Sequence, residues 1–205
     1  MKFPLLFALS CFLFSCEQEP VVSADPEVEA LPACCSEEEA LEASAESIYQ
    51  LDSKWTNDLG QEEPLSSLAG NIQIVTMGYT TCQYACPRLL LDMRAIEDRL
   101  PADLREKVRF TFVSIDPEVD TPERLAEYRA ENQIDPGHWT LLTGSLDSVQ
   151  ELAVVLGIQY RKTGEKDFAH SNVITVLNSK GEIVHRQEGL SADPAETLKA
   201  IAAAH

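Results

Sequence analysis

Several common sequence signatures are absent from this 205-residue chain. It contains no GxGxxG or GxxxxGKS run, the glycine-rich loops that usually hold nucleotide phosphates, and no internal repeat. Basic residues are few: 16 Lys and Arg stand against 34 Asp and Glu, giving a net charge of −18. This charge argues against binding to nucleic acid or to anionic lipid surfaces. Solubility is its simplest explanation, although an acidic surface also attracts cationic partners and metal ions.

The sequence also lacks an apolar run of the roughly 20 residues that a mature transmembrane helix needs. The shorter run PLLFALSCFLF follows Met1 and Lys2 and ends just before Ser15 and Cys16. A small residue before Cys at that place resembles a bacterial lipoprotein signal. The resemblance implies that residues 1–15 are a signal peptide, that Cys16 carries a diacylglyceryl group, and that the protein is lipid-anchored on the periplasmic side of a bacterial membrane. An ordinary signal peptide or an uncleaved anchor would export the chain as well.

Cysteine is too scarce for a disulfide-stapled fold. Of the six cysteines, Cys11 would leave with the signal peptide and Cys16 would carry the lipid, so Cys34, Cys35, Cys82 and Cys86 remain. Four thiols in about 190 exported residues are better interpreted as functional groups than as a disulfide scaffold. The first two lie in residues 16–47, which are rich in Glu, Ala, Ser and Pro and are predicted to form an acidic flexible tether. There they could be incidental thiols, a vicinal disulfide or an auxiliary metal site.

Residues 48–205 have the length of one domain with a proper core. Strand-like and helix-like runs alternate along them, which predicts an α/β domain with a partly parallel sheet covered on both faces. A loop is expected at 60–70. Strands are expected at 48–51, 54–57, 71–77, 108–115, 139–142, 172–177 and 183–187, and helices at 82–100, 121–131, 145–156 and from 193.

The pair Cys82 and Cys86, in the run TTCQYACP, is the most informative feature of the chain. It follows a buried strand and opens a helix, where positions i and i+4 share one face. Unpaired N–H groups and the partial positive charge at a helix start favour thiolates, so we expect both cysteines to be more acidic than free Cys. Such a pair can form a disulfide or hold a soft metal ion. A disulfide requires the helix start to be locally unwound, because the Cα separation must fall to about 4.4–6.8 Å.

A dithiol between the first core strand and its helix, with a closing hairpin and helix, is the thioredoxin-like arrangement. We therefore predict a thioredoxin-like α/β fold with extra N-terminal strands and a mixed central sheet flanked by helices. Thioredoxins place a cis-proline beside the dithiol. Here the corresponding stretch, DFAHSN, has no proline and carries His170. Two thiolates and one imidazole would suit Cu(I), and imidazole suits Cu(II) as well. His138, His185 and His205 have no comparable reason to meet the thiols.

The runs TMGYTTCQYACP, SIDPEVDTPERLAEY and DFAHSN together resemble the Sco/SenC family. The resemblance implies a membrane-tethered, thioredoxin-like copper protein that assists assembly of the CuA centre of cytochrome c oxidase. It carries the family's copper ligands onto Cys82, Cys86 and His170. The implied partners are the copper-bearing oxidase subunit or another copper-site protein, and a thioredoxin-like reductant. Gln83 and Tyr84 depart from the Pro and Asp of many members, a change that bears on redox potential and partner choice and leaves all three ligands in place.

Three functions compete on these residues. A metallochaperone would hold copper on the three ligands and pass it on by ligand exchange. A thiol–disulfide reductase would attack a partner disulfide with Cys82 and close a Cys82–Cys86 disulfide. A peroxiredoxin-like peroxidase ranks lowest, because the Pro and Thr that precede its reactive Cys are replaced by the run GYTT.

The acidic run that follows the second core strand is predicted to lie on the same rim as the dithiol. Asp116 could neighbour the ligands there or dock a partner. Helix capping explains the rest of the run, with Thr121 as the N-cap and Asp120 and Glu123 beside it.

Overall fold

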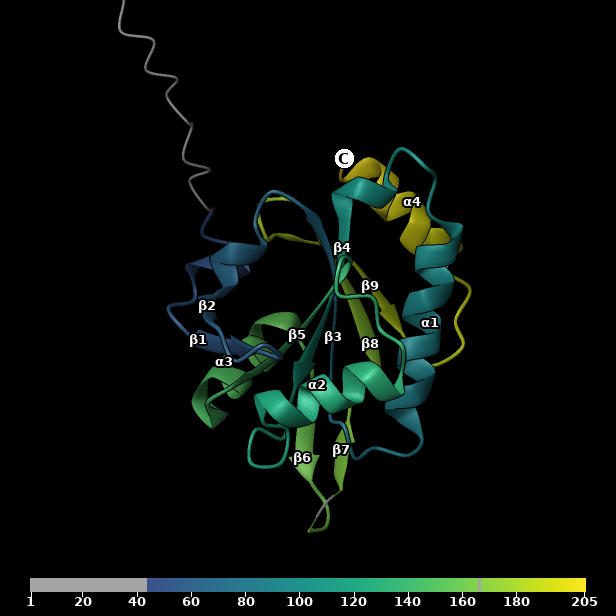
Figure 1. Cartoon of the computed structure of the whole chain (residues 1–205). Helices are drawn as coiled ribbons and strands as arrows, with labels where there is room; N and C mark the ends of the chain where they lie inside the picture. The colour runs from purple at the N-terminus through teal and green to yellow at the C-terminus, as the bar shows by residue number, and fades with distance from the viewer. Residues whose placement is uncertain (1–43, 166) are drawn as a thin grey trace, which may run out of the picture. The chain divides into compact units, whose positions relative to one another are not determined.

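The computed structural model describes residues 44–165 and 167–205 (Figure 1). The predicted signal peptide at 1–15, the lipidation site Cys16, the thiols Cys34 and Cys35 and most of the predicted tether lie outside the described residues. Within the described ranges, no helix combines the length and the hydrophobicity needed to cross a membrane.

A seven-stranded mixed sheet forms the centre of the domain, with the strand order β2-β1-β5-β4-β3-β8-β9. The three middle strands β5, β4 and β3 are parallel, and β1 and β8 join them antiparallel. This confirms the predicted mixed sheet with extra N-terminal strands. The strands are β1 (Lys54–Asn57), β2 (Glu62–Pro64), β3 (Ile72–Gly78), β4 (Val108–Ser114), β5 (Trp139–Gly144), β8 (Val173–Leu177) and β9 (Ile183–Glu188).

Helices cover both faces of this sheet (Figure 1). Because strand side chains alternate between faces, Ile74 and Phe112 join one buried cluster with α1, α2 and α4, whereas Val75 and Val113 join a second with α3. The apolar side chains that recur at helical spacing in residues 82–100 are buried, namely Leu89, Leu90, Met93, Ile96 and Leu100. The helices are α1 (Ala85–Arg99), α2 (Pro122–Glu131), α3 (Leu146–Leu156) and α4 (Ala195–Ala203), with short 3₁₀ turns η1 (Ile48–Gln50), η2 (Leu65–Leu68) and η3 (Arg105–Lys107).

Two N-terminal predictions were wrong. Residues 48–51 do not form a strand, because the N–H groups of Gln50 and Leu51 donate to the carbonyls of Ser47 and Ile48 and close the turn η1. The Ser47 hydroxyl caps the turn by accepting the N–H of Tyr49. The predicted loop at 60–70 contains β2 and η2. Ser44 and Ser47 hydrogen-bond to the turn between β8 and β9, so the last residues of the predicted tether pack against the domain.

A small two-stranded sheet was not predicted. The strands β6 (Tyr160–Lys162) and β7 (Phe168–His170) pair antiparallel with each other, and neither is hydrogen-bonded into the seven-stranded sheet. They project at the end of the domain where β3 runs into α1 (Figure 1). His170 therefore ends a strand of its own, rather than standing at the start of β8.

Candidate metal centre

The dithiol lies between β3 and α1, as predicted, but the helix begins later than expected. Cys82 is in the loop, where its N–H donates to the Tyr79 carbonyl at 3.3 Å, and α1 starts at Ala85. The Cys86 N–H then donates to the Cys82 sulfur at 3.4 Å. A thiol thus satisfies one of the N–H groups that a helix start leaves unpaired. The start of the helix is unwound around Cys82, which is the condition predicted for a disulfide.

The Cys86 thiol is enclosed, whereas Cys82 is half-buried. The backbone N–H of Tyr79 donates to the Cys86 sulfur at 3.4 Å. Gly78 lies directly against that sulfur: a Cβ at position 78 would be only 2.8 Å from it. Both cysteines are free thiols in the structure. The site therefore exposes one sulfur and shelters the other.

His170 completes the cluster from the end of β7. Its Nδ1 is 3.1 Å from the Ser171 carbonyl oxygen, and a carbonyl only accepts, so Nδ1 carries the proton. The Nε2 atom keeps its lone pair and lies 3.8 Å from the Cys86 sulfur. The two sulfurs and one ring nitrogen lie within 4.8 Å of one another. A carbonyl that fixes the tautomer and orients the ring is the usual support for a metal-binding imidazole.

The two thiols differ in acidity. A hydrogen bond from Cys86, aided by N–H groups of Cys86, Tyr84 and Ala85, lowers the pKa of Cys82 to about 4 although burial opposes it. The same thiol–thiol bond, together with burial, raises the pKa of Cys86. The expectation that both thiols would be acidic is thus confirmed for Cys82 and wrong for Cys86. These opposite shifts favour a thiolate on Cys82 and a proton on the buried Cys86 sulfur.

The loop before the dithiol is fastened by Asp120. This carboxylate is fully buried and accepts from the Thr80 N–H at 3.0 Å, from the Thr80 hydroxyl at 2.6 Å and from the Ser114 hydroxyl at 2.6 Å. Arg124 adds a bond to the Thr80 hydroxyl at 3.1 Å. Asp120 thus joins the end of β4 to the dithiol loop, a role beyond the capping predicted for it.

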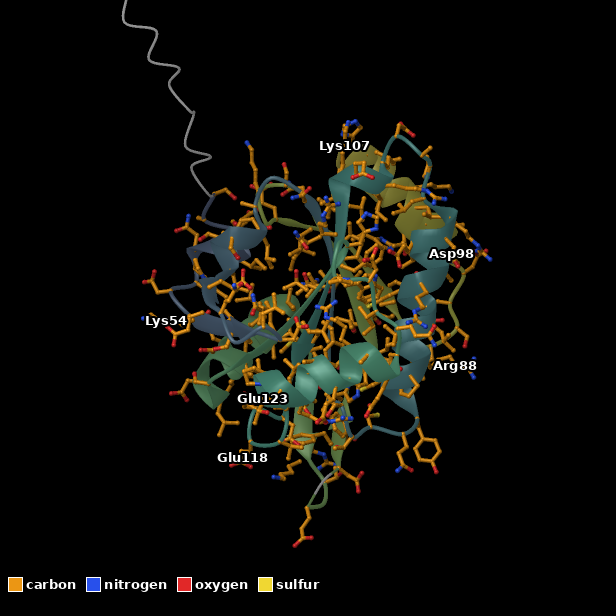
Figure 2. The ribbon with its side chains drawn as sticks, in the orientation of Figure 1. Lys54, Arg88, Asp98, Lys107, Glu118 and Glu123 are labelled. Atoms are coloured by element: carbon orange, nitrogen blue, oxygen red, sulfur yellow. The ribbon has the colours of Figure 1, made fainter. Side chains whose placement is uncertain are left out.

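The rest of the acidic run behaves in part as predicted. Thr121 caps α2 by accepting the Arg124 N–H, and Glu123 is exposed in the first helical turn. Asp116 is buried, and burial together with the charge of Asp120 raises its pKa. Figure 2 shows Glu118 and Glu123 at the end of the domain where β6 and β7 project, and Lys162 of β6 pairs with Glu118 at 3.4 Å.

The other histidines are engaged elsewhere. His138 lies 3.5 Å from Glu97, His185 contacts Thr197, and His205 contacts Lys107. Within residues 44–165 and 167–205, only Cys82, Cys86 and His170 form a cluster of three metal-ligating side chains. The structure therefore brings together the predicted trio and leaves the three histidines that were set aside apart from it.

Sequence reasoning missed the residues that support the ligands. Gly78, Tyr79 and Thr80 stand in the run TMGYTTC that was quoted for the dithiol, but no role was predicted for them. Their positions directly before the first Cys were the available signal. Tyr84, which departs from the common loop sequence, is 88% exposed beside the site.

Comparison with known proteins covers the part of the chain that holds this cluster. A family model described as SCO1/SenC matches residues 42–205. A putative copper-binding protein of Stutzerimonas stutzeri is 28% identical over 128 residues, which are 60% of this chain and 61% of that protein. The SCO1 protein homolog of Bacillus subtilis is 26% identical over 145 residues, or 69% of this chain and 75% of that protein. The chain thus matches less than two thirds of the first relative's length.

Solved structures of Sco proteins are also similar to this chain. Arabidopsis thaliana ScoI with copper bound has a TM-score of 0.66 at 25% identity, covering 74% of this chain and 96% of that one. Bradyrhizobium japonicum ScoI with copper bound has a TM-score of 0.63 at 25% identity, covering 75% and 97%. A putative electron transfer protein from Aquifex aeolicus VF5 has a TM-score of 0.70 at 23% identity, covering 79% and 95%, and shares the fold.

Proposed function

This chain belongs to the SCO1/SenC family, and from that membership we propose that it binds copper through Cys82, Cys86 and His170 and serves as a metallochaperone. The observation that carries the proposal is the convergence of two sulfurs and one imidazole nitrogen within 4.8 Å. Copper is named by the Stutzerimonas relative and by two solved structures at 25% identity. The proposed task is assembly of the CuA centre of cytochrome c oxidase.

The donor set suits copper on chemical grounds. Thiolates favour Cu(I), and an imidazole extends binding to Cu(II). In the neutral imidazole of His170, the Ser171 carbonyl favours the proton on Nδ1, which leaves the Nε2 lone pair to bind a metal. Binding through both sulfurs must release the proton that Cys86 retains, so uptake should depend on pH. Three protein ligands leave room for a Cys or His of the partner, which suits transfer by ligand exchange.

The place of action follows from the N-terminal sequence. We propose that residues 1–15 are removed on export and that Cys16 is lipidated. The predicted tether, residues 16–47, would then link the domain to the periplasmic side of a bacterial membrane. The partner is a copper-bearing oxidase subunit or another exported copper-site protein. The acidic charge of −18 supports a protein that does not use nucleic acid.

Copper titration of reduced residues 17–205 tests the site. We expect one tightly bound copper per chain, lost in Cys82→Ser and in Cys86→Ser. The matched control is the double variant Cys34→Ser, Cys35→Ser, which removes two thiols outside the described residues and should keep the copper. Unchanged binding in both single variants, or loss of binding in the control, would contradict the assignment.

A second function, thiol–disulfide reduction, is favoured by the unequal thiols. Cys82 is half-buried with its pKa lowered to about 4, and Cys86 is buried and protonated. An accessible thiolate beside a sheltered thiol is the arrangement of an attacking and a resolving cysteine. Reduction of a partner's copper-binding cysteines before metal loading would combine both roles.

His170→Ala separates the two functions. Disulfide exchange needs only the thiols, whereas copper binding also uses the imidazole. We expect the variant to weaken copper binding, Cu(II) above all, and to keep dithiol cycling. In cells, if copper delivery is the task, it should lower oxidase activity, and added copper should partly restore it. Full oxidase assembly in His170→Ala, with none in Cys82→Ser, would favour the reductase.

A further inference from the structure

Tyr79 contacts all three members of the cluster. Its backbone N–H donates to the Cys86 sulfur and its carbonyl accepts from the Cys82 N–H. Its side chain contacts His170: the two rings meet edge-on, with centroids 6.0 Å apart. The Tyr79 side chain is 4% exposed, so it is fixed between the dithiol loop and the strand that bears the histidine.

The side chain also fastens that strand. The Tyr79 hydroxyl accepts the backbone N–H of Phe168 at 3.3 Å, two residues before His170, and the two rings pack 5.2 Å apart. This matters because β7 pairs only with β6 and is not hydrogen-bonded into the seven-stranded sheet. Lys162–Glu118 also ties the hairpin to the domain, but an exposed ion pair stabilises little.

Building on the copper site proposed above, we propose that Tyr79 is a positioning residue that holds β7 so that Nε2 of His170 faces the two thiols. The backbone of Tyr79 hydrogen-bonds to the two cysteines, and its side chain contacts the imidazole and the strand that carries it. Cys86 and His170 are 84 residues apart in the chain, and the Tyr79 side chain contacts the strand that carries the histidine. The proposal concerns placement of the histidine, not transfer of the metal.

Tyr79→Phe tests the proposal because it removes the hydroxyl and keeps the ring. One buried hydrogen bond changes an equilibrium about threefold to tenfold, so we expect Cu(II) affinity to fall by that factor. The nitrogen hyperfine coupling in the Cu(II) EPR spectrum should weaken, whereas Cu(I) binding by the thiols should change less. The matched control is Tyr160→Phe, which removes a hydroxyl from the partner strand at the position paired with His170. No hydrogen bond from the Tyr160 hydroxyl occurs among the described residues.

A double-mutant cycle excludes the rival explanation. Burial, together with the neighbouring Cys82 thiol, raises the pKa of Tyr79, so the variant could act on that sulfur instead. If Tyr79 acts through His170, Tyr79→Phe should have no effect on copper affinity in the His170→Ala background. An equal fall in both backgrounds would overturn the proposal, and so would an unchanged affinity in Tyr79→Phe alone.

Amide hydrogen exchange in the metal-free, reduced protein gives a readout that needs no copper. We expect faster exchange at the Phe168 N–H in Tyr79→Phe and unchanged exchange in Tyr160→Phe. Unchanged exchange at Phe168 in Tyr79→Phe would count against the role of the hydroxyl. If the wild-type protein binds no copper, the proposed function fails while this measurement still decides what holds β7. Phe168→Leu, which removes the ring that packs against Tyr79, should reproduce the selective loss of Cu(II) affinity if Tyr79→Phe does not fold.

Discussion

Gly78 and Cys86 share a space that admits only one side chain. A Cβ on Gly78 would lie 2.8 Å from the Cys86 sulfur and 3.0 Å from Cε2 of Phe112. Real Cβ atoms do not approach other atoms so closely, and both neighbours are buried. The strand that leads to the dithiol therefore ends in a residue without a side chain so that the sheltered sulfur can pack against its backbone.

Gly78→Ala is accordingly expected to displace the Cys86 thiol. Overpacking of a buried site costs about 1–3 kcal/mol, so the thermal midpoint should fall and copper affinity should fall with it. Calorimetry and copper titration measure the two effects. Gly164→Ala is the matched control, because its Cβ would make ordinary contacts of 3.4 Å and 3.6 Å with Asp167. Wild-type stability and affinity in Gly78→Ala would show that the sulfur has room to move.

Asp120→Asn should loosen the loop that precedes the dithiol. The buried carboxylate accepts three hydrogen bonds from Thr80 and Ser114, and an amide cannot accept all of them while burying its own N–H groups. Because hydrogen bonds to a charged group are worth about 1.5–3 kcal/mol, we expect a loss of roughly 2 kcal/mol in the free energy of unfolding.

Urea unfolding measures that loss, with Glu123→Gln as the control from the same acidic run. Glu123 is exposed, so its variant should stay close to the wild type. If both variants lose the same small amount, general charge reduction explains the result and the specific anchoring by Asp120 does not.

Cys82 should react as a thiolate at unusually low pH. Its pKa is lowered from 9.0 to about 4, and lowering an acid's pKa extends its charged form downward in pH. In the reduced, metal-free protein, the iodoacetamide alkylation rate at Cys82 should be level near neutral pH and fall only as the pH drops through about 4. Peptide mass mapping assigns the modified residue. Cys86→Ala removes the largest cause of the shift and should move the midpoint upward; a midpoint near 9 in the wild type would contradict the prediction.

The parts of the fold that local sequence determines were predictable. The buried strands β3 and β4 are rich in apolar and β-branched residues, and Thr121 before Pro122 predicted the start of α2. The hairpin β6–β7 was missed because its short strands are largely exposed and its position depends on Phe168 meeting Tyr79, 89 residues away. For the same reason Asp120 was predicted only as part of a helix cap, since its partner Thr80 is 40 residues earlier.

The site itself was predictable in its chemistry more than in its support. Cys82, Cys86 and His170 were predicted as ligands because thiol and imidazole groups indicate metal binding when a thioredoxin-like chain brings them to the same edge of the sheet. The roles of Gly78 and Tyr79 were not predicted. The space that the glycine leaves for a sulfur and the contact of the tyrosine with β7 exist only in the folded chain. The unequal acidity of Cys82 and Cys86 likewise depends on which sulfur is enclosed.

Oxidation should close a Cys82–Cys86 disulfide and release copper. The loop conformation at Cys82 removes the constraint that a regular helix would place on the pair, because α1 begins only at Ala85. The Cys86 N–H already contacts the Cys82 sulfur at 3.4 Å, so the two residues are close without any large rearrangement. A disulfide consumes both thiolates, and His170 alone cannot hold Cu(I) tightly.

Mild oxidation of residues 17–205 followed by mass spectrometry should therefore find these two cysteines linked and the metal lost. A phosphine reductant should reopen the disulfide, and added Cu(I) should then bind again. The Cys34→Ser, Cys35→Ser double variant isolates the core pair from the thiols outside the described residues. If Cys82 and Cys86 stay free in that variant while copper is retained, the pair is a metal site that does not switch with redox state. Formation of the disulfide would instead couple copper release to the oxidation state of the compartment.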